Sequence, residues 1–472
     1  MPKLKRIFKY AKNYGLRSAL GLAREKLIVD KKRFSPDIER KIPSFPKEYN
    51  APTLNFKNSA NTPYTVLYLI HYFYPERKGG TERFTLNIAK EAARRGARPI
   101  VLVLDADSSE KGYTGRHGDI LYRYYDYDGI RCIGFRYRKA PLGLYYKRIS
   151  ENDAAMRLFA RFILKNEGVD IVHATYPQPF APFLFECKEQ KIPYVVTCTD
   201  FCMLCHYSTM VDSNGQFCGG GECGERCRRV CKSYGTGDFG KRHETAKRVL
   251  RGARIVTVPS EFVARVMSME FGGVGFLPVN HGISEQFKSG IKRTRVKNFV
   301  YAGTISRLKG IHLLISAFNR LSESDITLSI YGSGDDKYLE YLKSIASDRV
   351  EFFGAVSGDK MPEVYNSADC VIVPSMWYET YNFVLREAAS SGALVIASDI
   401  GAMSEAIREG ENGYLFRPSD EDDLYEKLKL ALDFDFSCYT RVDYPTLATE
   451  GELYDRIYRA SLAPDGSNAN MG

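Results

Sequence analysis

The sequence predicts an α/β protein with two domains, each built on a doubly wound parallel sheet. Three observations carry this prediction. The chain has 472 residues, which is more than one compact core usually holds. Short apolar runs alternate with amphipathic stretches of helical period over residues 64–271, and the alternation restarts over residues 298–398. A polar and basic stretch at 286–297 separates the two arrays and predicts a hinge.

The first array predicts one parallel sheet. It begins with an apolar run at 64–75, which a glycine pair, an amphipathic helical stretch and a second apolar run follow. This order predicts a strand, a helix and a parallel strand. Further short apolar runs continue the alternation and predict strands at 169–176, 192–200 and 253–260.

The second array repeats this pattern. Helices are predicted near 311–321 and 337–346, and strands are predicted within 298–306, 326–334, 349–356, 370–375 and 393–398. In doubly wound sheets a ligand lies beyond the carboxyl ends of the strands. We therefore expect the two domains to face one another, with the site in the cleft between them.

These patterns divide the chain into four parts. They are a basic amphipathic extension with a linker (1–62), an N-terminal domain (63–288) with a cysteine-rich insertion (198–231), a C-terminal domain (289–440), and a C-terminal segment (441–472). The tail of the last segment has so little apolar content that we expect it to be disordered.

The formal net charge of +10 is concentrated near the start of the chain. Residues 1–33 carry eleven Lys and Arg against Glu25 and Asp30, and apolar residues recur among them at helical spacing. This predicts amphipathic helices on an anionic membrane surface, with a solvated helix packed on the body as the alternative. The chain has no apolar run of 18 residues and no secretory h-region. We therefore expect a cytoplasmic protein at the inner face of the cytoplasmic membrane.

Two glutamates form the strongest chemical pattern. Glu379 follows a predicted strand, and Glu387 lies eight residues later in the next predicted helix. Eight helical residues rise about 12 Å, so the two carboxylates suit opposite ends of one polyhydroxylated ligand. Backbone N–H groups of Asn382, Phe383 and Val384 would lie between them at a helix N-terminus, which suits a phosphate. Taken alone, the spacing also fits two surface glutamates.

Four stretches in order resemble the retaining glycosyltransferases of family 4. The stretch "ETYNFVLREAASSGALVIASDIGAMSE" is similar to the family's glutamate pair followed by its S-D-x-G-G-x-x-E motif, with Ala402 for the second glycine. "YAGTISRLKG" resembles the family's phosphate-binding segment, and "YFYPERKGGTERF" resembles its N-terminal glycine loop. "YGSGDDKYLEYL" fills the expected order between them. The resemblance covers about residues 64–430 and implies a GT-B fold, that is, two facing Rossmann-like domains.

The resemblance also implies transfer of a sugar from a nucleotide-sugar donor, with retention at the anomeric carbon. It assigns Lys309 to the donor pyrophosphate, Glu387 to the ribose hydroxyls and Glu379 to the hydroxyls of the transferred sugar. It implies no side-chain nucleophile and no catalytic divalent metal. The implied catalytic residues are Glu379, Lys309 and Asp200, and the implied donor-binding residues are Gly79, Gly80, Arg307, Lys309, Asn382, Phe383, Val384 and Glu387.

Two positions depart from the family pattern. Thr304 stands where the family has an arginine, and Arg307 would supply that charge from a different direction. Thr199-Asp200 stands where the family has His-Asp. Because that histidine lies near the transferred sugar in the family, Thr199 puts the donor sugar in question and suits a sugar with a different group at C6.

Three other residues or patterns have two readings each. Asp105-Ala106-Asp107 has the form of a metal-binding D-x-D, but it closes a strand, and we expect a loop. Residues 332–336 ("GSGDD") resemble the dinucleotide-binding loop of an NAD-dependent oxidoreductase, but they lack its third glycine, which disfavours that function. His173 lies at a strand end and faces either the cleft or the core.

Seven of the eleven cysteines fall within 198–231. In a reducing compartment, clustered cysteines bind metal more often than they form disulfides. The layout resembles an insertion in one bacterial subgroup of family 4. On that resemblance a structural zinc, or alternatively an iron–sulfur cluster, would be held by Cys205, Cys218, Cys227 and Cys231. Cys198, Cys202 and Cys223 are then additional thiols, and free thiols throughout are the plain alternative.

Together these inferences predict a transferase that acts on a lipid-linked or polysaccharide acceptor in bacterial surface-glycan synthesis, without a nucleic-acid partner. The alternative is a zinc-stabilised nucleic-acid-binding protein on a GT-B-like scaffold, although the cysteine stretch lacks the recognition helix of a zinc finger. A hydrolase or phosphorylase on the same fold is a third reading.

Overall fold

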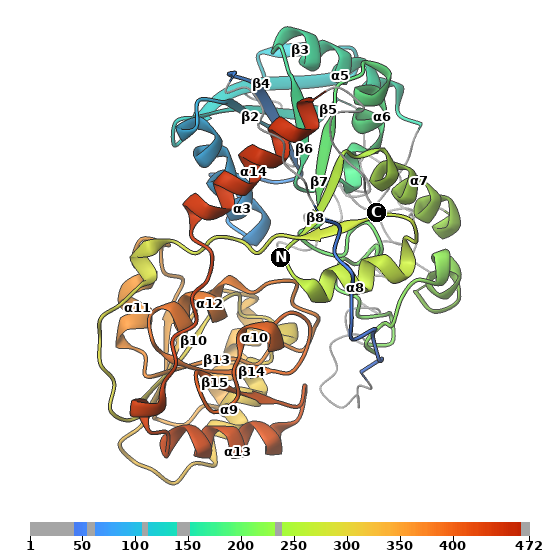
Figure 1. Ribbon diagram of the computed structural model, residues 1–472. Coiled ribbons are helices and arrows are strands. Elements are labelled where there is room, and N and C mark those ends of the chain that lie inside the picture. Colours follow the sequence, from blue (N-terminus) through green and yellow to red (C-terminus); the bar gives the residue numbers. More distant parts are fainter. Residues whose placement is uncertain (1–41, 54–61, 106–111, 139–151, 232–237, 464–472) are drawn as a thin grey trace. The chain divides into compact units, whose positions relative to one another are not determined.

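The computed structural model describes residues 42–53, 62–105, 112–138, 152–231 and 238–463 (Figure 1). The chain divides into two compact units. Unit 1 combines Met1–Val279 with Ala448–Gly472, and unit 2 is Asn280–Leu447. The basic helices predicted within 1–33, most of the predicted linker and most of the predicted disordered tail lie outside the described residues.

Unit 1 is built on one sheet, which has nine strands within the part of the chain that the structure describes. Its order is β3-β4-β5-β2-β1-β6-β7-β8-β9, and every pairing from β5 to β9 is parallel. The strands are β1 (Thr65–Ile70), β2 (Arg98–Leu104), β3 (Gly115–His117), β4 (Ile120–Tyr127), β5 (Ile130–Tyr137), β6 (Ile171–Ala174), β7 (Tyr194–Thr197), β8 (Ile255–Val258) and β9 (Phe276–Pro278). The helices are α3 (Gly80–Arg94), α5 (Ala154–Asn166), α6 (Ala181–Glu189), α7 (Phe239–Gly252), α8 (Glu261–Glu270) and α14 (Leu447–Leu462).

Helix α14, red in Figure 1, belongs to unit 1 although it follows unit 2 in the sequence. Its tyrosines complete a buried polar network on the sheet. The Tyr458 hydroxyl lies 2.7 Å from Nδ1 of His173, and the other ring nitrogen of His173 lies 2.7 Å from the Thr197 hydroxyl. His173 is fully buried, and burial lowers its pKa to about 3, so it is a neutral histidine. Of the two predicted positions, facing the cleft or facing the core, the core is correct.

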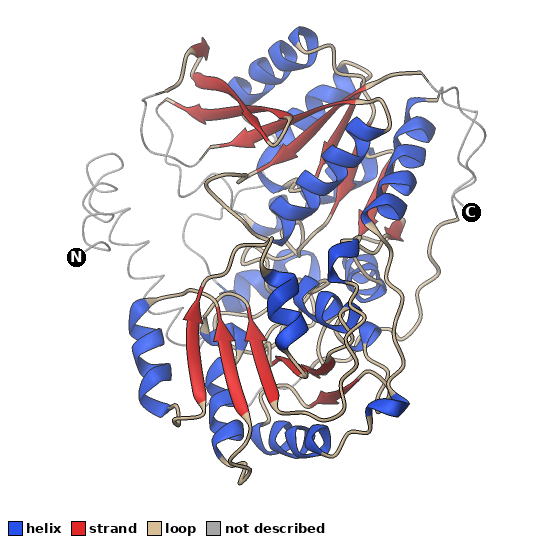
Figure 2. Cartoon of the chain, turned by 90° about the vertical axis from the view of Figure 1, so that its left-hand side faces the viewer, coloured by secondary structure: helices blue, strands red, loops and turns tan. Residues whose placement is uncertain are grey.

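Unit 2 is built on a six-stranded, wholly parallel sheet with the order β12-β11-β10-β13-β14-β15. Counted within the unit, this is the 3-2-1-4-5-6 order of a Rossmann sheet. Figure 2 draws the strands in red and the helices in blue. The strands are β10 (Asn298–Ala302), β11 (Thr327–Tyr331), β12 (Val350–Gly354), β13 (Cys370–Val373), β14 (Leu394–Ser398) and β15 (Gly413–Phe416). The helices are α9 (Ile311–Asn319), α10 (Asp336–Ile345), α11 (Met361–Ser367), α12 (Phe383–Ser390) and α13 (Glu421–Leu432).

Both faces of the unit 2 sheet are buried. Alternate residues such as Phe299 and Ile372 form one core with α9, α10 and α13. Their neighbours Val300 and Val371 are also buried and point to the opposite face, where α12 packs against β13 and β14. Because both faces are covered, the strands read in the sequence as continuous apolar runs, and this is why they were predictable.

No helix within the described residues is long and apolar enough to cross a membrane. The predicted domain limits of 288 and 440 differ a little from the compact units. Residues 280–288 group with unit 2, and α14 groups with unit 1 rather than with a separate C-terminal segment.

Candidate functional site

The switch point of the unit 2 sheet lies between β10 and β13, which are neighbours in space. From β10 the chain continues to β11 on one side of this pair, and from β13 it continues to β14 on the other side. Ligands of doubly wound sheets bind beyond the carboxyl ends of the strands at such a point, because the loops there leave in opposite directions. Lys309 lies in the loop after β10, and Glu379 lies in the loop after β13.

The backbones of these two loops are in direct contact. Gly310 has a φ of +69°, and a Cβ there would lie 1.9 Å from the carbonyl oxygen of Pro374. The Met376 N–H donates to the Leu308 carbonyl at 2.7 Å. Only glycine fits this close approach, which fixes the position of the turn that carries Lys309 (η5, Arg307–Lys309).

Lys309 and Glu379 form a half-buried ion pair at 2.6 Å, between Nζ and Oε1. The Ser375 hydroxyl and the Trp377 indole N–H donate to the same oxygen, each at 2.7 Å. Burial by itself raises the pKa of the Glu379 carboxyl, but Lys309, Ser375 and Trp377 together hold this pKa below its usual range. Glu379 is therefore an ionised carboxylate in a largely buried place.

The loop after β14 supports the backbone of Glu379. Gly401 has a φ of +69°, and a Cβ there would lie 2.4 Å from the Glu379 carbonyl oxygen. The Ala402 N–H donates to that same oxygen at 2.8 Å. Buried Arg386 ties the two loops together by donating to the carbonyl oxygens of Tyr381 and Ala402. The S-D-x-G part of the motif thus positions Glu379 through backbone contacts.

Glu387 lies inside α12 and is buried, with its carboxylate accepting from the Tyr365 hydroxyl at 3.0 Å. Helix α12 begins at Phe383, after Asn382, whose φ is +66° and whose side chain accepts from the Leu385 N–H. Glu379 therefore precedes the helix, and the helical rise of about 12 Å does not describe the separation of the two carboxylates. The first N–H groups of α12, at Phe383 and Val384, remain the predicted phosphate contacts.

Arg307 stacks its guanidinium over two rings of α10. It lies 5.0 Å from the centre of the Tyr338 ring and 5.5 Å from that of Tyr341. Thr304, where the resemblance places an arginine, is exposed. Whether Arg307 supplies the missing charge stays a prediction.

Sequence reasoning missed two residues of this site, Ser375 and Trp377. Both donate to Glu379, and Lys309 lies 5.2 Å from the centre of the Trp377 ring. One feature of the sequence could have indicated them. Trp377 is the single tryptophan of the chain, and it lies two residues before the first motif glutamate.

In unit 1, Thr199 and Asp200 follow β7. The Thr199 hydroxyl lies 2.9 Å from that of Thr81 and donates to the Thr175 carbonyl at 3.2 Å. Asp200 accepts from the Cys202 N–H at 2.8 Å, and burial raises the pKa of its carboxyl to about 6. A carboxyl with this pKa exchanges protons near neutrality, which suits a proton acceptor.

The glycine pair precedes α3, and Gly79 is its N-cap. A Cβ on Gly79 would lie 2.4 Å from a carboxylate oxygen of Glu82, which also accepts backbone hydrogen bonds at this turn. Glu82 thus folds back over the start of its own helix, and a side chain at position 79 would require only that the Glu82 carboxylate move. The predicted ligand contacts of Gly79 and Gly80 stay predictions.

Two family models match the chain in tandem. "Glycosyltransferase Family 4" matches residues 78–274, and "Glycosyl transferases group 1" matches residues 296–433. Together they cover more than two thirds of the chain and include the Gly79–Gly80 turn, Lys309, Glu379 and Glu387. The chain belongs to glycosyltransferase family 4.

Curated relatives of this family 4 glycosyltransferase match it over part of their length. A lipopolysaccharide 1,2-N-acetylglucosaminetransferase of Salmonella typhimurium is 36% identical over 147 residues, which are 28% of this chain and 38% of the relative. An uncharacterised glycosyltransferase of Methanocaldococcus jannaschii is 34% identical over 134 residues, which are 27% of this chain and 34% of the relative. The chain therefore spans little more than a third of these relatives.

Solved structures share the fold of the family 4 chain over most of its length. HepE of Anabaena, in complex with UDP, has a TM-score of 0.57 at 16% identity and covers 84% of this chain and 95% of its own. The catalytic domain of starch synthase IV of Arabidopsis thaliana has a TM-score of 0.58 at 16% identity and covers 85% and 100%. These likenesses establish the GT-B class of two Rossmann-like domains.

The predicted zinc ligands of the family 4 chain are all buried in the cysteine-rich insertion. Cys227 donates a hydrogen bond to Cys231, which lowers the pKa of the Cys231 thiol. However, among the described residues the metal-ligand atoms that lie within 4.8 Å of one another in a set of three or more belong to other residues, and none of the four predicted sulfurs is among them. The structure does not support the four-cysteine zinc site. The insertion is instead tied down by buried Arg242 of α7, which donates to the carbonyl oxygens of Cys202, Met203 and Leu204.

Structural roles account for the D-x-D pattern at 105–107 and for the glycines at 332–336, which resemble binding motifs in the sequence. Asp105 forms a 2.8 Å ion pair with Arg123, and Asp107 lies outside the described residues. A Cβ on Gly332 or on Gly334 would lie 1.9 Å from a carbonyl oxygen of the loop after β10. The glycines of 332–336 therefore serve the packing of two loops against each other.

Proposed function

We propose that this family 4 glycosyltransferase transfers a sugar from a nucleotide-sugar donor to an acceptor hydroxyl, with retention at the anomeric carbon. One observation carries the proposal. A cation and a carboxylate, Lys309 and Glu379, are held together at the switch point of the unit 2 sheet, where Rossmann-like domains bind nucleotides.

The chemistry of the pair fits the two halves of a nucleotide sugar. The donor diphosphate competes with Glu379 for the ammonium of Lys309, and the cation then stabilises the charge that develops as the diphosphate leaves. Glu379 keeps its charge in this exchange because Ser375 and Trp377 still donate to it. Its carboxylate then accepts from hydroxyls of the transferred sugar. Glu387 is assigned to the ribose, and no catalytic metal is required.

Asp200 is the unit 1 candidate for a role in the reaction. Because the pKa of its carboxyl is raised to about 6, Asp200 can accept a hydrogen bond from the acceptor hydroxyl when it is ionised. The same carboxyl can take up or release a proton close to neutral pH. Thr199, in place of the family histidine, presents a smaller group beside it. We therefore keep the prediction of a donor sugar that differs at C6.

The donor can be identified with the chain's own fluorophore. Trp377 is the single tryptophan, so its emission should change when a nucleotide sugar displaces Lys309. Among UDP-, GDP- and dTDP-sugars, we expect one nucleotide class to change the emission and to stabilise the fold by about 2.7 kcal/mol at 100 times its Kd. Glu387→Gln should weaken that binding by about 10- to 100-fold, because a hydrogen bond to a charged group is lost.

Glu426→Gln is the matched control for this measurement, because Glu426 is an exposed glutamate of α13 in the same unit. It should leave binding unchanged. If no nucleotide sugar changes the emission or the unfolding temperature, the proposed activity is wrong. Equal binding by Glu387→Gln and wild-type protein would remove the ribose assignment alone.

We further propose that the acceptor is lipid-linked or a polysaccharide of the bacterial surface, and that transfer occurs at the inner membrane face. Two observations support this. One curated relative is named as a lipopolysaccharide N-acetylglucosaminetransferase. Residues 1–33 carry eleven basic residues in an amphipathic pattern. Both family models describe glycosyltransferases, which disfavours the nucleic-acid alternative.

Removal of residues 1–33 should lower binding to vesicles that contain anionic lipid. Each Lys or Arg near such a surface contributes on the order of 1 kcal/mol. Donor binding, followed by Trp377 emission, should be unchanged in the same variant, because the donor site lies in unit 2. Co-sedimentation with vesicles tests the proposal, and equal sedimentation of the two proteins would refute the membrane role.

A further inference from the structure

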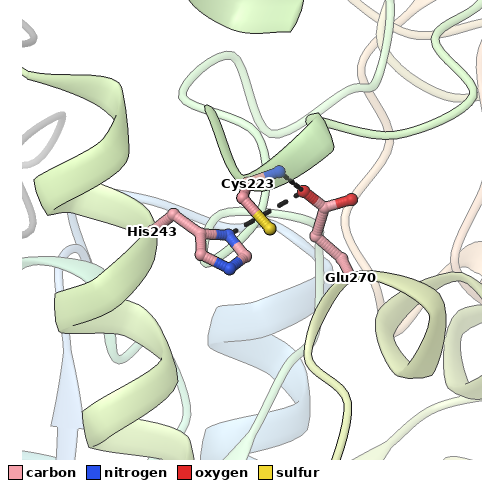
Figure 3. Close-up of side chains that lie close together, drawn as sticks. All are labelled: Cys223, His243 and Glu270. Carbon is pink, nitrogen blue, oxygen red and sulfur yellow. Dashed lines mark hydrogen bonds and ion pairs between the residues drawn. The ribbon is translucent and has the colours of Figure 1, made fainter. Parts of the chain in front are cut away.

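Three side chains of unit 1 bring metal-ligand atoms together away from the transferase residues (Figure 3). Cys223 lies in the short turn η2 (Glu222–Gly224), His243 in α7 and Glu270 at the end of α8. One ligand atom from each lies within 4.8 Å of the other two. In the described ranges of the chain, no other set of three or more Cys, His, Asp or Glu residues meets this condition.

The Glu270 carboxylate is fixed by the backbone of the insertion. Its Oε1 accepts from the Cys223 N–H at 2.8 Å, and its other oxygen accepts from the Gly221 N–H at 3.2 Å. Nδ1 of His243 lies 3.8 Å from the same Oε1. Cys223 has a φ of +53°, a left-handed conformation that costs about 1–2 kcal/mol in a residue with a side chain. The two hydrogen bonds from this turn to Glu270 oppose that cost.

The His243 ring is fixed as well. It is stacked on Phe271, with the ring centres 4.8 Å apart and the planes at 8°. The side chains of His243 and Glu270 are only 6% and 9% exposed, whereas Cys223 is exposed. A ring nitrogen of a neutral imidazole offers a lone pair to a metal. A buried carboxylate and imidazole beside an accessible thiol form a preorganised set with an open side.

We propose that Cys223, His243 and Glu270 bind a zinc ion. Sulfur, imidazole nitrogen and carboxylate oxygen are the ligand types that zinc takes in proteins, and three protein ligands leave one position of a tetrahedron for water. Binding releases the thiol proton to solvent and joins the insertion to α7 and α8. The proposal concerns the stability of unit 1 and does not depend on the transferase reaction.

This site differs from the one that cysteine spacing suggests. Spacing within 198–231 favours a four-thiolate site and leaves Cys223 as a spare thiol. The structure instead combines Cys223 with two residues outside the insertion, so only one thiolate takes part. The number of thiolates bound to the metal therefore separates the two possibilities.

Zinc content and cobalt spectra of the full chain test the proposal. Wild-type protein should hold about one zinc per chain, as a single site does. Cobalt in its place should show sulfur-to-metal absorption of one thiolate rather than four. Cys223→Ser should abolish that absorption. Cys223→Ser and His243→Gln should each lower zinc affinity by about 100-fold or more, which exceeds the usual loss of affinity when a residue that only supports a metal ligand is changed.

Two controls are matched to these variants. Cys438→Ser changes the other exposed cysteine among the described residues, and Glu261→Gln changes an exposed carboxylate at the opposite end of α8. Both should keep the zinc. Far-UV circular dichroism checks folding, and Cys223→Ser remains decisive if His243→Gln unfolds, because Cys223 is exposed.

Two results would overturn the proposal. Zinc that survives Cys223→Ser and His243→Gln but is lost on changing Cys227 and Cys231 would place the metal at the predicted cysteines. Wild-type protein without zinc and without cobalt–thiolate absorption would show that the three residues only anchor the loop.

Discussion

Replacement of Lys309 by Gln should lower kcat/KM for sugar transfer by about 10³-fold or more. If Lys309 binds the donor diphosphate as proposed, the variant removes this cation, and loss of a single group that stabilises developing charge already costs about 10²–10³-fold in kcat. It also removes the partner of the buried Glu379 carboxylate at 2.6 Å. Steady-state kinetics with the donor that the fluorescence screen identifies would measure the loss.

Measurements of stability distinguish a catalytic role of this ion pair from a role in holding the two loops together. Lys309→Gln leaves the buried Glu379 carboxylate without its cation, and Glu379→Gln leaves the half-buried Lys309 ammonium without its carboxylate. Each change should cost about 2–3 kcal/mol of unfolding free energy. The double variant has no stranded charge and should recover most of that stability, but it should stay inactive. Recovery of activity in the double variant would show that the pair only holds the loops together.

A surface pair of the same unit gives the control. Lys429 lies 3.3 Å from Glu426, both side chains are exposed, and Lys429→Gln should cost no more than about 1 kcal/mol of unfolding free energy. Its transfer rate should match that of the wild type. A similar loss of stability in the two Lys variants would mean that the Lys309–Glu379 pair is an ordinary surface contact.

The same variant changes the pH dependence. The pKa of Glu379 is depressed in the folded protein, so its contribution to stability is present above the unfolded-state pKa and is lost as pH falls through the folded one. In Lys309→Gln, burial is no longer opposed by the cation and the pKa must rise. The acid limb of stability should therefore move to higher pH, and urea unfolding over a pH series would detect it.

Gly310→Ala should reduce transfer by at least about 10²-fold and cost about 2–4 kcal/mol of stability. A Cβ at this position would lie 1.9 Å from the Pro374 carbonyl oxygen, so the loops after β10 and β13 must separate. Lys309 adjoins this contact and Glu379 lies five residues beyond Pro374. Displacement of reacting groups by about 1 Å can cost 10²-fold in rate. Transfer kinetics and thermal unfolding measure the two effects.

Gly354→Ala is the matched control. Gly354 lies in the same unit and has a φ of +75°, but a Cβ there would meet nothing within 4 Å. It carries only the left-handed backbone cost of about 1–2 kcal/mol and should leave transfer unchanged. Equal activity losses in the two variants would contradict the assignment of Gly310 as the contact that positions Lys309.

Local patterns in the sequence predicted the parallel-sheet architecture and most of its elements. The helix predicted at 311–321 is α9 at Ile311–Asn319, and the helix predicted at 337–346 is α10 at Asp336–Ile345. These elements were predictable because sheets covered on both faces need continuous apolar strands, and amphipathic helices must bury one stripe. The order of motifs around Lys309, Glu379 and Glu387 likewise indicated family 4.

Tertiary structure decided which side chains meet. The sequence does not pair Lys309 with Glu379 or direct Ser375 and Trp377 to one carboxylate oxygen, because β10 and β13 become neighbours only in the folded sheet. It assigns α14 to a separate segment, whereas the buried tyrosines of that helix complete the polar network of His173.

The cysteines show the same division between sequence and structure. Spacing selects ligands that are close along the chain, but a metal requires donor atoms that are close in space. Cys223, His243 and Glu270 meet because α7, α8 and the insertion pack together, and no short-range pattern connects them. The sequence by itself determined the fold class and the family, since both are encoded in local periodicity and motif order. The pairing of charges and the convergence of donor atoms depend on contacts between distant segments, which only the folded chain creates.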